Sequence, residues 1–172
     1  YITYDFETME QVINKTITKA TTVNSRLIPL SVSCCIKSST GTMTKHFDAR
    51  NKNFIVDWLK FMFEQAVNVV IDKIKFYKSM LNTDEVDLIK SIVPDLNTIT
   101  VFGFNSARFD SNLFKEFLNY KSESFEWTVD NNSLIGSATA LKQFIIYSKT
   151  TQSSLRFIDA QSFVAGGTLK QF

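Results

Sequence analysis

Two carboxylates near the start of the chain have the spacing of a metal-binding strand. Asp5 and Glu7 lie two residues apart, next to Tyr4 and Phe6, whose aromatic side chains favour a β-strand. Positions i and i+2 of a strand project from the same face, so the two acids would stand together, opposite the two rings. Neighbouring negative charges repel each other, and a bound divalent cation such as Mg²⁺ would relieve the repulsion. The alternative is a solvent-facing edge strand with two exposed acids.

A further candidate acid follows a hydrophobic strand later in the chain. Residues 98–105 end in Asn105, and after Ser-Ala-Arg the chain enters an expected helix at Phe109 and Asp110. In open α/β sheets, functional groups collect where strands end and loops begin. Asn105 suits the unusual backbone of such a turn. Asp110 also has a structural explanation, because the helix dipole favours an acid in a first turn.

Together these acids suit a site for divalent cations. Asp5, Glu7 and Asp110 would supply three carboxylates, the ligand type that Mg²⁺ and Mn²⁺ prefer. Phe109 by itself would be interpreted as a core residue. The one histidine, His46, is expected to be a partly exposed strand residue, so the chemistry would not depend on a histidine base.

The expected elements alternate between strands and helices. Period-two and continuous apolar runs predict strands over residues 1–6, 27–37, 41–48, 98–105, 133–149 and 153–160. Hydrophobic positions three and four apart predict a long amphipathic helix over 53–81, with the inward stripe Phe54, Trp58, Phe61, Met62, Gln65, Val69 and Phe76. A helix over 109–120 would bury Leu113, Phe114, Phe117 and Leu118, and a shorter one is expected over 83–93. The polar stretch 8–26 is expected to be a loop. This order predicts the α/β class, with a mixed central sheet flanked by helices.

Composition restricts the class of protein. The 172 residues, 44% of them hydrophobic, fit one domain with a substantial core, and the net charge of +2 gives no general basic surface for nucleic acid. The adjacent Cys34 and Cys35 suggest buried free thiols in a reducing compartment. The sequence contains neither a long apolar span nor a signal-peptide pattern. The first residue is not Met and residues 166–172 read like the start of a helix, so we expect a piece of a longer protein, incomplete at its C-terminus.

Two stretches resemble exonuclease motifs of family B DNA polymerases. "YDFET" (4–8) resembles the first motif, and "FNSARFD" (104–110) resembles the second; "LRFIDAQSF" (155–163) points to the protein-primed branch, found in linear plasmids, fungal mitochondrial elements, certain phages and adenoviruses. The resemblance implies a ribonuclease-H-like 3′→5′ exonuclease fold. It further implies that Asp5, Glu7 and Asp110 bind two Mg²⁺ or Mn²⁺ ions. Thr8, Asn105 and Phe109 would hold the 3′ end of single-stranded DNA.

The chain departs from that family at the third motif, Tyr-x-x-x-Asp, which supplies a fourth carboxylate and a catalytic tyrosine. Among the tyrosines only Tyr1 has an aspartate at this spacing, and that aspartate, Asp5, already belongs to the first motif. Asp159 is interpreted as a strand-end residue, with catalysis as the lesser alternative.

The resemblance also implies a further domain, macromolecular partners and a cellular location. A DNA polymerase domain is expected downstream, with primer–template DNA and a terminal priming protein as partners and no membrane association. The protein would replicate a linear DNA in a mitochondrion, or alternatively in a cytoplasmic plasmid or a virus. Two other interpretations remain open: a free-standing exonuclease of the same superfold, and a catalytically degenerate DNA-binding remnant.

Overall fold

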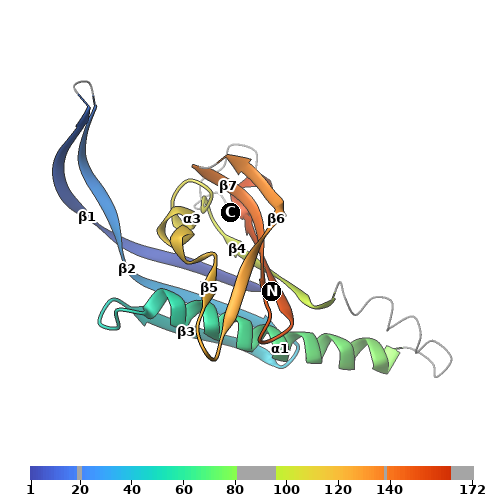
Figure 1. The fold of residues 1–172 in the computed structure, drawn as a ribbon. Coiled ribbons are helices and arrows are strands. Elements are labelled where there is room, and N and C mark those ends of the chain that lie inside the picture. Colours follow the sequence, from blue (N-terminus) through green and yellow to red (C-terminus); the bar gives the residue numbers. More distant parts are fainter. Residues whose placement is uncertain (19–20, 81–95, 138, 164–172) are drawn as a thin grey trace.

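The protein is built on a single eight-stranded mixed sheet (Figure 1). The computed structural model describes residues 1–18, 21–80, 96–137 and 139–163. The strands are β1 (Ile2–Thr18), β2 (Thr21–Ser38), β3 (Gly41–Asp48), β4 (Thr98–Gly103), β5 (Tyr120–Lys121), β6 (Glu126–Ser137), β7 (Ala140–Ser148) and β8 (Ser153–Asp159). The helices are α1 (Phe54–Met80) and α3 (Asp110–Leu113), with the 3₁₀ turns η2 (Lys115–Phe117) and η3 (Ala160–Phe163). The predicted α/β class and mixed sheet are confirmed, whereas the short helix predicted over 83–93 lies outside the described residues.

The strand order brings three parallel strands together in the middle of the sheet. The order is β3-β2-β1-β4-β8-β7-β6-β5, in which β1 and β8 both run parallel to β4 and the remaining neighbours are antiparallel. Tyr4 is the register partner of Gly103, and Gly103 is in turn the partner of Asp159. The carboxyl ends of β4 and β8 therefore meet at one edge, where β1 runs past them. Functional groups collect at such edges in α/β sheets.

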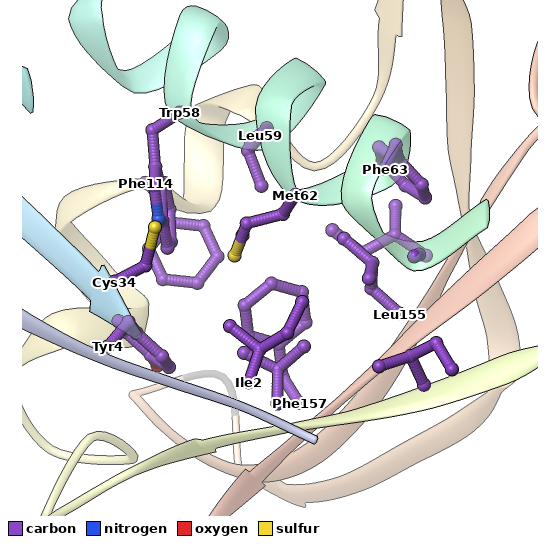
Figure 2. Packing of buried hydrophobic residues seen from close by; sticks show 14 of the residues in the cluster. Ile2, Tyr4, Cys34, Trp58, Leu59, Met62, Phe63, Phe114, Leu155 and Phe157 are labelled. Carbon is purple, nitrogen blue, oxygen red and sulfur yellow. The ribbon is translucent and has the colours of Figure 1, made fainter. Parts of the chain in front are cut away.

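One face of the sheet carries an aromatic core against α1 (Figure 2). The Tyr4 ring contacts Trp58 of α1 at a centroid distance of 5.3 Å, and Phe114 packs on Trp58 at 5.2 Å. The predicted stripe of α1 is confirmed at Trp58 and its buried neighbours, but Phe76 is 55% exposed, because α1 extends beyond the sheet at this end. None of the helices in the described ranges is long and apolar enough to span a bilayer.

The loop predicted over 8–26 was wrong, because residues 8–18 and 21–26 are strand. β1 and β2 continue past the sheet as a curved two-stranded ribbon, which projects away from the rest of the molecule (Figure 1). None of the described side chains of the ribbon is buried, and Met9, Val12 and Leu27 are all exposed. Because period-two hydrophobic alternation arises only where one face is buried, this segment lacks the signal on which the prediction depended.

Two further boundaries differ from the prediction. The helix expected over 109–120 ends at Leu113, because Phe114 adopts a non-helical ψ of 9° and places its fully buried ring in the aromatic core. The single strand expected over 133–149 is the end of β6 and the whole of β7, and Gly136 near the end of β6 has φ of 121° at a shift in the register against β7. Tertiary packing in the first case and a glycine with positive φ in the second override the local pattern.

The predictions for the cysteines and the histidine can be compared with the structure. Cys34 is a buried free thiol, as predicted, whereas Cys35 is a free thiol that is only half-buried. His46 has a side chain that is 54% exposed, and its Nδ1 lies 2.9 Å from Ser33 Oγ on the neighbouring strand. The structure thus gives His46 a surface role within the β2–β3 pair.

Candidate active site

The first two candidate acids share a face of β1, as predicted. Tyr4 and Phe6 are buried toward α1, whereas Asp5 and Glu7 are exposed on the opposite side of the strand. The register of β1 against β2 shifts between Glu7 and Thr8, so the strand has an irregularity directly after the two acids. Bulges of this kind re-aim side chains and are common beside active sites.

The turn that follows β4 is compact and depends on particular residues. A Cβ atom on Gly103 would lie 2.6 Å from Ser106 Cβ and 2.8 Å from the Tyr4 ring, so only glycine fits where β4 ends. Asn105 has φ of 53°, which confirms the prediction that it occupies the unusual backbone position of this turn. Ser111 N–H donates to Ser106 O at 2.9 Å and closes the turn onto α3.

Asp110 is the residue at which the two motifs meet. It is the first residue of α3 and is only 7% exposed. Burial, together with the negative charges of Asp5 and Asp159, raises the pKa of Asp110 to about 7. Asp5 from the first motif and Asp110 from the second are therefore close enough to repel each other. Glu7, the third predicted ligand, stands on the same face as Asp5, two residues further along β1.

Behind Asp110 lies a small buried polar cluster. The Tyr4 hydroxyl is buried beside Ser106 and Ser111 and makes no hydrogen bond of standard geometry within the described part of the chain. Burial raises the pKa of Tyr4 well above its usual range, and the charges of Asp110 and Asp159 add to this effect. Asp159 ends β8, as predicted, but the sequence did not indicate that its carboxylate accepts a hydrogen bond from Ala107 N–H, 3.1 Å away.

A cavity of about 400 Å³ opens beside Asp5. Its lining is mainly apolar and includes Phe102, Phe104 and Ala160, with Asp5 at one wall. Phe109, the predicted base-stacking residue, precedes α3 and is 51% exposed, so it is not a core residue. Thr8, the other predicted DNA contact on β1, is half-buried at the start of the ribbon.

The arrangement of the acidic side chains around Asp110 can be compared with the predicted metal site. Within the described ranges, no three histidine, cysteine, aspartate or glutamate side chains are gathered closely enough to hold a metal ion as they stand. Asp110 is nevertheless buried and lies near two other negative charges, and a bound cation would relieve this electrostatic repulsion. Carboxylate oxygens are the ligands that Mg²⁺ and Mn²⁺ prefer. Carboxylates are suitable ligands for the predicted Mg²⁺ or Mn²⁺ ions, and Asp5 and Asp110 lie at the centre of the predicted site.

Comparison with protein-family models, curated proteins and solved structures found no match to this chain. The features that point to a function are therefore the two motifs and the way the fold brings them together.

Proposed function

We propose that this chain is the 3′→5′ exonuclease region of a DNA polymerase that resembles the protein-primed branch of family B. One observation carries the proposal: the parallel pairing of β1 with β4 brings Asp5 to the turn that leads into Asp110, and the charge of Asp5 raises the pKa of Asp110. Two motifs far apart in sequence thus converge at one edge of the sheet. Convergent carboxylates at such an edge are what metal-dependent phosphodiester hydrolysis requires.

The proposed roles follow from position. Asp5, Glu7 and Asp110 bind two Mg²⁺ or Mn²⁺ ions, which would supply an activated water and stabilise the leaving oxygen. The exposed Phe109 ring stacks on a base at the 3′ end, an interaction worth about 1–3 kcal/mol per base that tolerates any sequence. Asn105 and Thr8 contact the same strand. Tolerance of sequence is what a proofreading enzyme needs, since any terminal nucleotide can be the wrong one.

The topology supports a ribonuclease-H-like fold for this region. The antiparallel unit β3-β2-β1 lies beside parallel β4 and β8, so the strand with the first motif and the strand before the second are direct neighbours. In this proposal, a polymerase domain, primer–template DNA and a terminal priming protein complete the system, which replicates a linear DNA in a mitochondrion or on a plasmid or virus.

The experiment is release of nucleotides from a 3′-labelled oligonucleotide by the complete gene product with Mg²⁺. Asp5→Ala and Glu7→Ala should each abolish degradation and leave primer extension intact, because separate sites carry the two activities. Glu64→Ala, which removes an exposed acid from α1, is the matched control and should retain both activities.

Each alternative gives a different result. Degradation without any primer extension would indicate a free-standing exonuclease. DNA binding without degradation in either Mg²⁺ or Mn²⁺ would indicate a degenerate remnant. Degradation that survives both substitutions would contradict the proposed site. The 172 residues lack the third exonuclease motif, Tyr-x-x-x-Asp, so we expect this chain alone to have almost no exonuclease activity.

A further inference from the structure

Asp159 lies beside the turn that carries the proposed DNA-binding and metal-binding residues. Its register partner is Gly103, the last residue of β4, so the chain leaves β4 next to the Asp159 carboxylate. Asp159 is 5% exposed. Its Oδ2 atom accepts a hydrogen bond from Ala107 N–H at 3.1 Å, and its Oδ1 atom accepts one from Gln161 N–H at 3.0 Å. The carboxylate thus joins the 104–109 turn on one side to the start of η3 on the other.

The bond to Ala107 ties the turn to the sheet. The bond between Ser111 N–H and Ser106 O, in contrast, stays within the segment that follows β4. Ala107 is only 3% exposed, so water cannot readily replace Asp159 as the acceptor of its N–H. A buried N–H that loses its acceptor is destabilising, and a hydrogen bond to a carboxylate is about twice as strong as a neutral one.

We propose that Asp159 is a positioning residue for the nuclease site. It holds the 104–109 turn against β8 and thereby fixes the Phe109 ring and the start of α3, which carries Asp110. This inference rests on the proposed function and adds a residue that the exonuclease motifs in the sequence do not include. Asp159 acts through Phe109 on the DNA strand, and each of its oxygens accepts a hydrogen bond from a backbone N–H.

A carboxylate is needed here because it accepts at two oxygens at once. In Asp159→Asn the amide NH₂ is a donor, so one of the two backbone N–H groups loses its acceptor. Asp159 also lies close enough to Asp110 for the two charges to repel each other. A second buried acid at this place is unfavourable by itself, and its two backbone hydrogen bonds offset that cost.

The test compares Asp159→Asn with wild type in the full 172-residue chain. Mn²⁺ binding is measured by electron paramagnetic resonance. Binding of a fluorescein-labelled ten-nucleotide oligothymidylate with a 3′-terminal phosphorothioate is measured by anisotropy. We expect DNA affinity to fall about tenfold, as part of the stacking is lost, while Mn²⁺ affinity changes less than about threefold. Hydrogen exchange should become about tenfold faster at the amide that faces the new NH₂ group, which is that of Ala107 or that of Gln161. Asp130→Asn, which alters a similar bond from Asn132 N–H in β6, should leave all three measurements unchanged.

A double mutant separates positioning from a general loss of structure. If Asp159 acts through Phe109, then Asp159→Asn should weaken DNA binding little further when Phe109→Ala is already present. Additive losses, or DNA affinity unchanged in Asp159→Asn, would overturn the inference. So would a loss of Mn²⁺ affinity as large as that of DNA, which would make Asp159 a ligand. If the wild-type chain binds neither Mn²⁺ nor DNA, the proposed function itself fails. Unchanged exchange at both Ala107 and Gln161 would separately refute the hydrogen-bonded role.

Discussion

Replacing Asp110 by asparagine should change how the stability of the protein depends on pH. The pKa of this carboxyl is raised from the ordinary 3.8 to about 7 by burial and by the charges of Asp5 and Asp159. The folded state therefore holds the proton more tightly than the unfolded chain does. The contribution of Asp110 to the free energy of unfolding is most favourable at low pH, and it is lost as the pH rises from about 4 through about 7.

The size of the effect follows from the shift. A change of about three units at about 1.36 kcal/mol per unit gives about 4 kcal/mol as an upper limit, and solvent screening at the rim of the site reduces the expected value to about 2 kcal/mol. Asparagine does not titrate. The free energy of unfolding of Asp110→Asn minus that of wild type should therefore increase by about 2 kcal/mol between pH 4 and pH 8.

The assay is urea denaturation followed by tryptophan fluorescence at several pH values, in the absence of divalent ions. Wild type and variant are compared at each pH, so other titrating groups cancel. The value at pH 4, where Asp110 is protonated in the folded protein, serves as the internal reference. A difference that stays constant or shrinks as the pH rises would show that Asp110 does not experience the buried acidic surroundings described above.

Two other substitutions test the stacking surface and the turn. Phe109→Ala should weaken single-stranded DNA binding by about 1–3 kcal/mol, measured by anisotropy, and leave Mn²⁺ affinity nearly unchanged, because a stacking surface is lost and no charge is; equal losses of both would mean that the site has collapsed. Gly103→Ala should lower the free energy of unfolding by about 1–3 kcal/mol in urea denaturation, since its Cβ would overlap the Ser106 Cβ and the Tyr4 ring, and an unchanged midpoint would contradict that crowding.

The part of the site that follows from strand periodicity was predictable. Alternation along β1 separates Asp5 and Glu7 from Tyr4 and Phe6, and the structure has this division. Asn105 at the end of a hydrophobic strand likewise predicted a turn with an unusual backbone. In both cases a local rule is enough, because the constraint comes from chain geometry and from burial of a single face.

The missed features depend on tertiary contacts. The short α3 reflects the place that Phe114 takes in the aromatic core, where its ring lies 5.3 Å from that of Phe157, a residue far along the chain. The role of Asp159 depends on the register between β4 and β8, which no local pattern encodes. The ribbon of β1 and β2 was not predicted, because none of its described side chains is buried and its strands therefore carry no hydrophobic period.

Mn²⁺ binding to the 172-residue chain tests the central claim most directly. Electron paramagnetic resonance titration should detect Mn²⁺ bound to wild type, with the affinity reduced about tenfold or more by Asp5→Asn, Glu7→Gln or Asp110→Asn, since each removes a carboxylate ligand. Glu116→Gln, which alters an exposed acid of the neighbouring η2 turn, should bind Mn²⁺ like wild type. The claim that the two motifs form one metal site would be contradicted if wild type did not bind Mn²⁺, or if all three site variants bound Mn²⁺ as tightly as wild type does.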